Sequence, residues 1–448
     1  MTAAAHVFVD VGNTLAVPFL TGFQRHTREI LAELPREGGP LVFVPVLWCE
    51  GCAAFRRLDA PEKADLVRFA PRPETRPGPA RRLLGGLPSP IAHRVRRVVN
   101  EGPGGRLRRA AAARRLARDH PPHHAALRID PWPDGSWLFD LAAVWHGPPQ
   151  RAELLPRLRE EGVRTATLVA DLLPLTHPEW FVDHQEALFG GFLDAHLRTS
   201  DLFVCISRFT EADLLDRARA RHLPTPRTAL TTMGADFVAQ PSGTDRVPGT
   251  PTGRFALCVG TVEPRKNHRI LLDAYRAVRR HGLDLGLVVV GRAGWMTHRL
   301  QAEMRELERL DAGFRWFDKA DDETLSRLYR DAFVAVQPSW SEGFGTPVIE
   351  ALAQGVPTLS SNGGALPEAG GEWAEYFDPA DGDALVGLLT RHLTDDEHHR
   401  SRRNLLTGYV PPTWADSAAG IVEAFGHVVG RNEGGRRSHA GAEVPSGP

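Results

Sequence analysis

The chain alternates short apolar runs with longer segments in which apolar residues recur every three or four positions. The short runs are typical of buried strands in a parallel sheet, and the longer segments are typical of amphipathic helices. Strands are expected at residues 7–11, 41–47, 137–141, 165–169, 202–206, 255–259, 285–290, 314–317, 334–336 and 356–359. Because helical segments separate many of these runs, the pattern predicts an α/β chain with parallel, doubly wound sheets.

A segment rich in Pro, Gly, Ser and Thr interrupts the alternation at residues 240–253 and is typical of an interdomain linker. The strand and helix pattern restarts beyond it, and 448 residues suffice for two domains with separate cores. We therefore expect domains at residues 1–239 and 254–411. An amphipathic helix is expected at residues 412–429, and a polar, disordered tail at residues 430–448.

An arginine-rich insertion within the first domain, at about residues 70 to 120, differs from the rest of the chain. Ile91, Val95, Val98 and Val99 form an apolar stripe there at helical spacing. A basic amphipathic helix of this kind can lie on anionic lipid. A solvated, irregular insertion would have the same composition, so both interpretations stay open. Nucleic-acid binding is disfavoured, because no recognition module accompanies the charge.

The composition is that of an ordinary soluble protein, with 42% apolar and 24% charged residues. A formal net charge of −1 gives no overall attraction to nucleic acid or membrane. Four cysteines argue against a disulfide framework, and the pair Cys49 and Cys52 is interpreted as packing thiols rather than as a metal or redox site. With neither a long apolar run nor a signal-peptide pattern, a cytoplasmic location is expected.

The stretch from Val334 to Asn362 holds the strongest chemical signal. A buried strand is followed by a glycine-rich loop and by a helix that we expect Thr346 to cap and Gly355 to end. Such a turn presents free N–H groups and the positive end of a helix dipole, which suit a phosphate. Glu342 in the loop and Glu350 on the helix could bind hydroxyls of the same ligand. The alternative is that both are solvated surface charges.

The spacing of Glu342 and Glu350 resembles the Glu-x7-Glu signature of retaining nucleotide-sugar glycosyltransferases of the GT-B fold, in particular family 4. This resemblance implies two Rossmann-like domains that face a central cleft. It also implies that Glu342 holds the donor sugar and Glu350 the ribose hydroxyls. Glu342 is expected to lie in a loop outside the core. The rest of the donor turn is expected at Gly343, Phe344, Gly345 and Thr346.

The run Gly260-Thr-Val-Glu-Pro-Arg-Lys-Asn267 resembles the diphosphate-binding loop of the same family. The resemblance implies that Lys266 neutralises the leaving nucleoside diphosphate, helped by Arg265. Many relatives have an arginine where this chain has Thr261, so a further cation is expected from Arg292. The alternative is that these residues are exposed surface cations.

Two segments of the first domain extend the resemblance. Gly22 lies in a segment similar to the family's N-terminal loop that faces the donor phosphates, although an ordinary helix start would look the same. Asp171 lies in a segment similar to the one where donor and acceptor meet. That segment often has histidine where this chain has Ala170, so only Asp171 is expected to take part in catalysis.

The resemblance implies transfer of a hexosyl group, with its anomeric configuration kept, from a nucleotide sugar to a glycan or lipid-linked acceptor. Mannose from GDP-mannose, used in cell-surface polysaccharide synthesis, is the expected donor. No cofactor or metal is expected, and no nucleic-acid partner. A peripheral position at the inner membrane face is an additional expectation. A sugar-nucleotide epimerase of the same fold and a non-catalytic nucleotide-sugar-binding protein remain alternatives.

Overall fold

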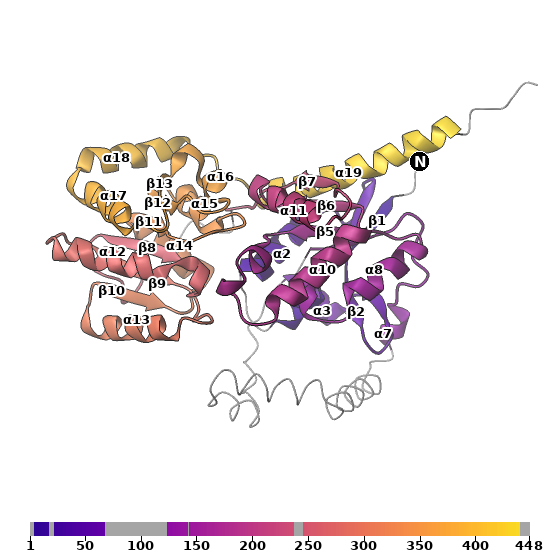
Figure 1. Ribbon diagram of the computed structural model, residues 1–448, viewed down its shortest axis with the longest axis horizontal. Helices are drawn as coiled ribbons and strands as arrows, with labels where there is room; N and C mark the ends of the chain where they lie inside the picture. Colours follow the sequence, from indigo (N-terminus) through magenta and orange to yellow (C-terminus); the bar gives the residue numbers. More distant parts are fainter. Residues whose placement is uncertain (1–3, 18–21, 68–122, 142, 237–244, 440–448) are drawn as a thin grey trace, which may run out of the picture. The chain divides into compact units, whose positions relative to one another are not determined.

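The computed structural model describes residues 4–17, 22–67, 123–141, 143–236 and 245–439 (Figure 1). The arginine-rich insertion predicted at about residues 70 to 120 lies outside these ranges, and so does part of the predicted linker. The chain divides into two compact units, residues 1–166 and 167–448. The domain boundary predicted at residue 239 stays a prediction.

The first sheet has the strand order β3-β2-β1-β4-β5-β6-β7. Its strands are β1 Ala5–Asp10, β2 Leu41–Cys49, β3 Ala54–Arg57, β4 Trp137–Asp140, β5 Arg164–Val169, β6 Leu202–Cys205 and β7 Thr228–Leu230. β1 pairs in parallel with both β2 and β4, β6 pairs in parallel with β7, and the edge strand β3 is antiparallel to β2. The sequence predicted five of these strands, and missed the short strands β3 and β7.

Helices follow most strands of this sheet. They are α1 Gly12–Ala16, α2 Gly22–Glu33, α3 Ala60–Val67, α7 His123–Ala126, α8 Arg151–Glu160, α9 Leu173–Thr176, α10 Gln185–Thr199 and α11 Arg208–Ala220, with 3-10 turns at Val144–His146 and Pro178–Trp180. Ser207 caps α11, since its side chain accepts a hydrogen bond from the Thr210 N–H.

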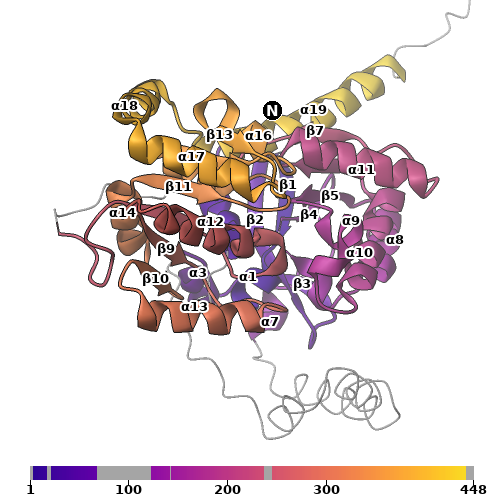
Figure 2. The ribbon, with the colours of Figure 1, turned by 60° about the vertical axis from the view of Figure 1, so that its left-hand side comes forward.

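The second sheet is parallel throughout, in the order β10-β9-β8-β11-β12-β13 (Figure 1). Figure 2 shows β10, β9, β11 and β13 of this sheet from the bottom upward. Its strands are β8 Phe255–Val259, β9 Gly286–Val290, β10 Phe314–Phe317, β11 Val334–Gln337, β12 Thr358–Ser361 and β13 Glu375–Phe377. The strand order reverses between β8 and β11. In doubly wound sheets, ligands bind at such a reversal, outside the carboxyl ends of the strands.

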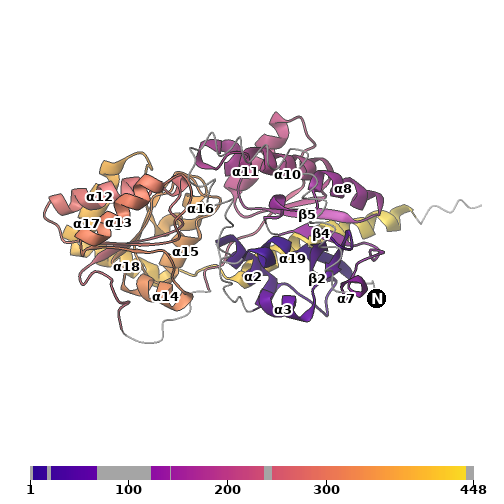
Figure 3. The same ribbon diagram turned by 90° about the horizontal axis from the view of Figure 1, so that it is seen from below.

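Helices cover both faces of the second sheet. They are α12 His268–Arg280, α13 His298–Leu310, α14 Asp322–Asp331, α15 Thr346–Ala353, α16 Leu366–Gly370, α17 Gly382–Thr394 and α18 Asp396–Leu405, with 3-10 turns at Pro264–Lys266, Gly371–Trp373 and Leu406–Gly408. The final helix, α19 Trp414–His439, instead contacts β6 and β7 of the first sheet. Core residues of α12, α13 and α17 pack on one face, and those of α14 and α15 pack on the other. Figure 3 shows α12 and α13 on the opposite side from α14.

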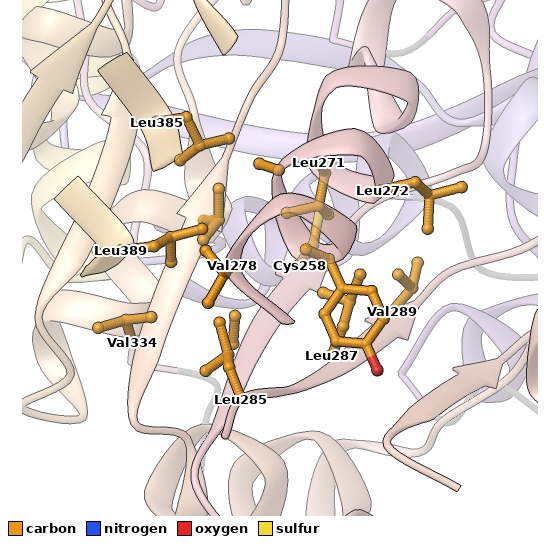
Figure 4. Close-up of a cluster of buried hydrophobic side chains, with 14 of the residues drawn as sticks. Cys258, Leu271, Leu272, Val278, Leu285, Leu287, Val289, Val334, Leu385 and Leu389 are labelled. Atoms are coloured by element: carbon orange, nitrogen blue, oxygen red, sulfur yellow. The ribbon is translucent and has the colours of Figure 1, made fainter. Parts of the chain in front are cut away.

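The larger core of this region lies between the sheet and the helices α12 and α17 (Figure 4). Leu271, Leu272, Tyr275 and Val278 form the buried stripe of α12, spaced as one helix face requires. Burial of each such side chain stabilises the fold by about 1.5 to 3 kcal/mol. This core fixes the strands whose carboxyl ends carry the loops of the candidate site.

The structure corrects two local predictions. The N-cap of α15 is Gly345 at φ 114°, and Thr346 is the first helical residue without a capping side chain. Glycine is required because a Cβ at this position would lie 2.6 Å from Leu366 Cδ2. The end of the helix was predicted correctly, since Gly355 follows it at φ 70°. The final helix, α19, continues to His439, past the tail predicted to begin at residue 430.

Candidate active site

The loops after β8 and β9 pack closely at the carboxyl edge of the second sheet. The Gly260 N–H donates to Val290 O at 2.8 Å, and the Val262 N–H donates to Arg292 O at 2.8 Å. A Cβ on Gly291, whose φ is 155°, would lie 1.9 Å from Gly260 O. Only glycine fits so close a backbone approach. The contact directs the segment that carries Arg265 and Lys266 over the strand ends.

The segment after Gly260 is held in place by a 3-10 turn and by a side-chain anchor. Pro264 opens the turn, and Asn267 ends it in the left-handed region at φ 51°. The Asn267 side chain donates to Pro379 O at 2.8 Å instead of capping α12. The Trp340 N–H donates to Arg265 O at 2.8 Å, which ties this segment to the loop after β11.

Glu342 occupies the centre of the loop after β11 and is closely held. Its Oε1 accepts hydrogen bonds from the Ser339 hydroxyl at 2.7 Å and from the Gln337 amide at 3.1 Å. Its backbone oxygen accepts from the Ala365 N–H at 2.9 Å. The carboxylate therefore has one orientation, set by neighbours from β11 and from the following loops.

Two cations meet the same carboxylate. Lys266 Nζ lies 2.5 Å from Glu342 Oε1, and Arg265 donates to Glu342 Oε2. Arg265 Nη2 also donates to Glu263 Oε1 at 2.8 Å. The side chains of Glu342, Lys266 and Arg265 are only 8%, 11% and 16% exposed. The four residues thus form a nearly buried cluster of two cations and two carboxylates.

The charges in this cluster determine the ionisation of Glu342. Burial acts to raise the pKa of Glu342, but Arg265 and Lys266 outweigh it and lower the pKa to about 2. Burial likewise opposes the charge of Arg265, and the neighbouring carboxylates raise its pKa. Glu342 is therefore ionised at neutral pH. The expectation that this residue lies outside the core was wrong, because its cations hold it inside.

Asp171 follows β5 and lies in the same compact unit as this cluster. Burial raises the pKa of Asp171, Arg265 lowers it, and Glu342 raises it further. Its Oδ1 accepts the Leu173 N–H at 3.1 Å. A Cβ on Gly343 would lie 2.0 Å from Ala170 O and 2.9 Å from Asp171 Cβ. Glycine at 343 is thus needed for the close approach of the glutamate loop to this segment.

Glu350 lies on α15, and its side chain faces the interior. The Tyr329 hydroxyl donates to Glu350 Oε2 at 2.7 Å, and both residues are buried. Thr346 is buried in the first turn of the same helix. Phe344 lines a cavity of about 340 Å³ together with Ile349 and Trp373.

The remaining predicted donor residues lie at different places. Arg292 is half-buried in the loop after β9, and its backbone carbonyl accepts a hydrogen bond from the Val262 N–H. Gly22 is the exposed first residue of α2, in the other compact unit.

Sequence reasoning missed three residues that shape the cluster, Glu263, Gln337 and Ser339. It also missed Tyr329, which orients Glu350. Gln337 carried a usable signal, because a polar residue ended an otherwise apolar strand pattern. A buried polar side chain at a strand end needs a partner, and here that partner is Glu342.

Comparisons with known proteins agree with this geometry. Residues 245–405, which carry both loops, match the family model for glycosyl transferases group 1. The matched region is less than half of the chain, and it includes Arg265, Lys266, Glu342 and Glu350.

Two relatives from Escherichia coli extend the match beyond this domain. The chain is 30% identical over 304 residues to the serotype-specific mannosyltransferase WbdA, which covers 63% of this chain and 36% of WbdA. It is 29% identical over 271 residues to O-antigen chain mannosyltransferase B, which covers 56% of this chain and 66% of that protein. The chain thus spans about a third of WbdA and about two thirds of the second relative.

Solved structures share the fold at low sequence identity. Sucrose-phosphate synthase from Thermosynechococcus elongatus is 18% identical, with a TM-score of 0.57 over 95% of this chain and 100% of that one. Anabaena HepE in complex with UDP and glucose is 13% identical, with a TM-score of 0.59 over 94% and 100%. The prediction of a GT-B fold with two Rossmann-like sheets is confirmed. None of the helices in the described part of the chain is both long and apolar enough to cross a bilayer.

Proposed function

We propose that this chain transfers a mannosyl group, with retention, from GDP-mannose to a hydroxyl of a glycan or lipid-linked acceptor in cell-surface polysaccharide synthesis. The relatives named as mannosyltransferases support the sugar, and the name of the second supports an O-antigen type of product. The family domain supports the class of reaction.

The observation that carries the proposal is the meeting of Lys266, Arg265 and Glu342 where the strand order reverses. A nucleoside diphosphate bound there would lie beside two cations and the amides that begin α15. As the sugar departs, negative charge grows on the diphosphate. Fixed cations then stabilise the transition state more than the bound donor, which raises turnover.

Glu342 and the diphosphate compete for the same two cations. Lys266 has three N–H donors, and within the described residues its hydrogen-bond acceptor is Glu342. When a diphosphate binds, it takes over part of the pairing of Lys266 and Arg265. This exchange frees carboxylate oxygens of Glu342 to accept hydrogen bonds from the donor sugar. Before the donor binds, Glu342 therefore neutralises the two cations and keeps them in position.

Further roles follow from the positions of the other residues. Asp171, whose pKa is raised by burial, takes part where sugar and acceptor hydroxyl meet. Glu350, held by Tyr329, binds the ribose, and Arg292 supplies a further cation. Gly343, Phe344, Gly345 and Thr346 form the donor turn, and Gly22 also contributes to donor binding.

The cations of the proposed site are side chains, so we propose transfer without a metal ion or cofactor. Full turnover in the presence of EDTA is the expected result, and loss of turnover that Mg²⁺ or Mn²⁺ restores would refute this part. We also propose that the chain works in the cytoplasm, with its acceptor at the inner membrane face.

A donor screen followed by a transfer assay tests the proposal. GDP-mannose should raise the melting temperature more than UDP-glucose, UDP-N-acetylglucosamine or GDP-fucose do, because a tighter ligand stabilises the folded state more. Release of GDP should then require a mannan-type or lipid-linked acceptor. Conversion of the free donor without acceptor would indicate the epimerase instead, and binding without any turnover would indicate a non-catalytic sugar-nucleotide protein.

A further inference from the structure

A cluster of one carboxylate and two imidazoles lies in the first unit, apart from the residues of the proposed transfer reaction. Asp59 precedes α3, and His123 and His124 form the first residues of α7. His124 Nε2 lies 3.2 Å from Asp59 Oδ2, and His123 Nε2 lies 3.5 Å from the same oxygen. All three candidate ligand atoms lie within 4.8 Å of one another.

The carboxylate of Asp59 is oriented by a reciprocal cap at the start of α3. Its Oδ1 accepts the Glu62 N–H at 2.9 Å, and Glu62 Oε2 accepts the Asp59 N–H at 2.9 Å. Oδ2 therefore points to the histidines. The nearest arginine, Arg56, is neutralised by two hydrogen bonds of 2.7 Å to Glu62. The negative charge of Asp59 is thus available to a cation.

The backbone next to α7 is also fixed. The Arg57 N–H donates to Leu127 O, and the Ile129 N–H donates to Phe55 O, both at 2.9 Å. These bonds tie the segment after α7 to the edge strand β3. The two imidazoles are therefore presented by an anchored backbone, which is the second-shell support that a metal site needs.

The distances in this cluster also match those between two ligands of one metal ion. Two ligands at 2.0 to 2.1 Å from a tetrahedral Zn²⁺ lie about 3.3 Å apart. The separations of 3.2 and 3.5 Å from Asp59 Oδ2 bracket this value. The His123 side chain is 61% exposed, which leaves an entry path and an open position for water.

A second cluster of one carboxylate and two imidazoles is less suited to a metal ion, because its ligand atoms already have other partners. Glu375 contacts His392 at 2.7 Å and His398 at 3.0 Å, both distances of direct hydrogen bonds. Arg402 lies 3.3 Å from the same carboxylate, and the other nitrogen of His392 contacts His399 at 3.0 Å. A metal ion there would have to displace these bonds and face the charge of Arg402. This cluster serves as an internal control.

We propose that Asp59, His123 and His124 form a binding site for Zn²⁺ or a similar divalent transition-metal ion, with water completing the coordination. The ion would join chain positions up to 65 residues apart. Closing so long a loop stabilises the folded chain, so the role is structural. This inference does not depend on the proposed transfer reaction.

Co²⁺ titration of the metal-free full chain, followed by visible absorption, tests the site. We expect one equivalent to give d–d bands of a four- or five-coordinate ion without the intense sulfur-to-cobalt band that Cys49 and Cys52 would produce. Zn²⁺ should displace the Co²⁺ and should raise the melting temperature. A sulfur-to-cobalt band, or the absence of saturable binding at micromolar Co²⁺, would overturn the proposal.

Matched variants locate the ion. Asp59→Asn keeps a helix-capping oxygen but loses the ligand charge, and His124→Asn removes one imidazole. Each should weaken Co²⁺ binding at least tenfold and abolish the Zn²⁺-induced rise in melting temperature. His398→Asn in the second cluster should change neither. Binding that survives Asp59→Asn, or that is lost in His398→Asn, would contradict the assignment.

Discussion

The two sheets carry charge clusters of opposite composition where their strand orders reverse. In the first sheet the reversal lies between β1 and β4, and one cation, Arg151, lies between two carboxylates, Asp10 and Asp140. In the second sheet it lies between β8 and β11, and one carboxylate, Glu342, lies between two cations.

The first cluster is closed. Arg151 Nη2 contacts Asp10 at 2.6 Å and Asp140 at 2.8 Å, Nε contacts Asp140 at 2.6 Å, and Nη1 donates to Pro149 O at 3.1 Å. All three charged side chains are buried. Burial raises the pKa of Asp10, and Arg151 only partly offsets it. This arrangement holds strands together, and four of the five N–H donors of Arg151 are already hydrogen-bonded.

In the proposed mechanism the second cluster opens. Glu342 is the shared acceptor of Lys266 and Arg265, and an incoming anion can replace it without leaving a cation unpaired. The comparison teaches that a buried ion cluster is not by itself a sign of function. The two clusters differ in the charge of the central side chain. In the first sheet a cation is surrounded by carboxylates, and in the second sheet a carboxylate is surrounded by cations that can also bind an anionic ligand.

Removal of the shared group in the first sheet should have the largest effect on stability. Arg151→Met leaves Asp10 and Asp140 buried without their cation, so we expect a loss of about 3 to 5 kcal/mol in the free energy of unfolding. Urea unfolding monitored by circular dichroism measures it. The matched change in the second sheet, Lys266→Met, leaves Glu342 paired with Arg265 and should cost less than half as much. Equal losses would contradict the comparison.

Replacement of the shared carboxylate in the second sheet should mainly affect turnover. Glu342→Gln keeps the shape of the side chain, and we expect turnover to fall by about 3 kcal/mol in transition-state stabilisation. The amide is a better test than alanine, which would leave buried Lys266 without its acceptor while Arg265 keeps Glu263. Steady-state kinetics with GDP-mannose and acceptor measure the effect. Near-normal turnover in a folded variant would remove Glu342 from the mechanism.

The pH dependence of stability should separate the clusters. The pKa of Glu342 is lowered from 4.5 to about 2, so its contribution is full above pH 4.5 and is lost as the pH falls toward 2. The pKa of Asp10 is raised, so its contribution grows as the pH falls. Between about pH 5 and 3, wild type should therefore lose more stability than Glu342→Gln. Parallel curves from urea unfolding at each pH would contradict the assignment.

A smaller effect, on donor affinity, is expected when the hydrogen-bond partner of Glu350 is removed. Tyr329→Phe removes the hydroxyl that donates to Glu350 Oε2, while the ring still fills the core. We expect donor affinity to weaken by about 1 kcal/mol, with little change in turnover, since the ribose is remote from the reacting bond. Calorimetry with GDP measures the affinity. A large loss of turnover with unchanged affinity would place Glu350 in the chemical step.

Much of the second sheet could be predicted from sequence, because β8 and β9 are apolar runs and β11 is apolar up to Gln337. The short strand β13, with the sequence Glu-Tyr-Phe, was missed. β8 and β10 were predicted to the residue. The helices α13 and α18 were missed, because their highly charged sequences hide a narrow apolar stripe. The resemblance also pointed to Lys266 and Glu342 as site residues.

What the sequence could not show is the pairing between distant residues. The contact of Glu342 with Lys266 joins positions 76 apart, and that of Arg151 with Asp10 joins positions 141 apart. Such contacts depend on strand order, which local patterns do not encode. For this reason Glu342 was expected in an exposed loop, although its cations make it a buried residue.

Turnover of Lys266→Ala at saturating GDP-mannose tests the central claim most directly, with GDP affinity measured in parallel by calorimetry. The exposed Lys319→Ala is the control and should behave as wild type. Lys266→Arg keeps the charge in a planar fork and should restore part of the activity. We predict that Lys266→Ala lowers turnover by about 3 kcal/mol, or about a hundredfold, and also weakens GDP binding. Unchanged turnover with only a raised KM for the donor would show that Lys266 binds the ground state and would contradict the account.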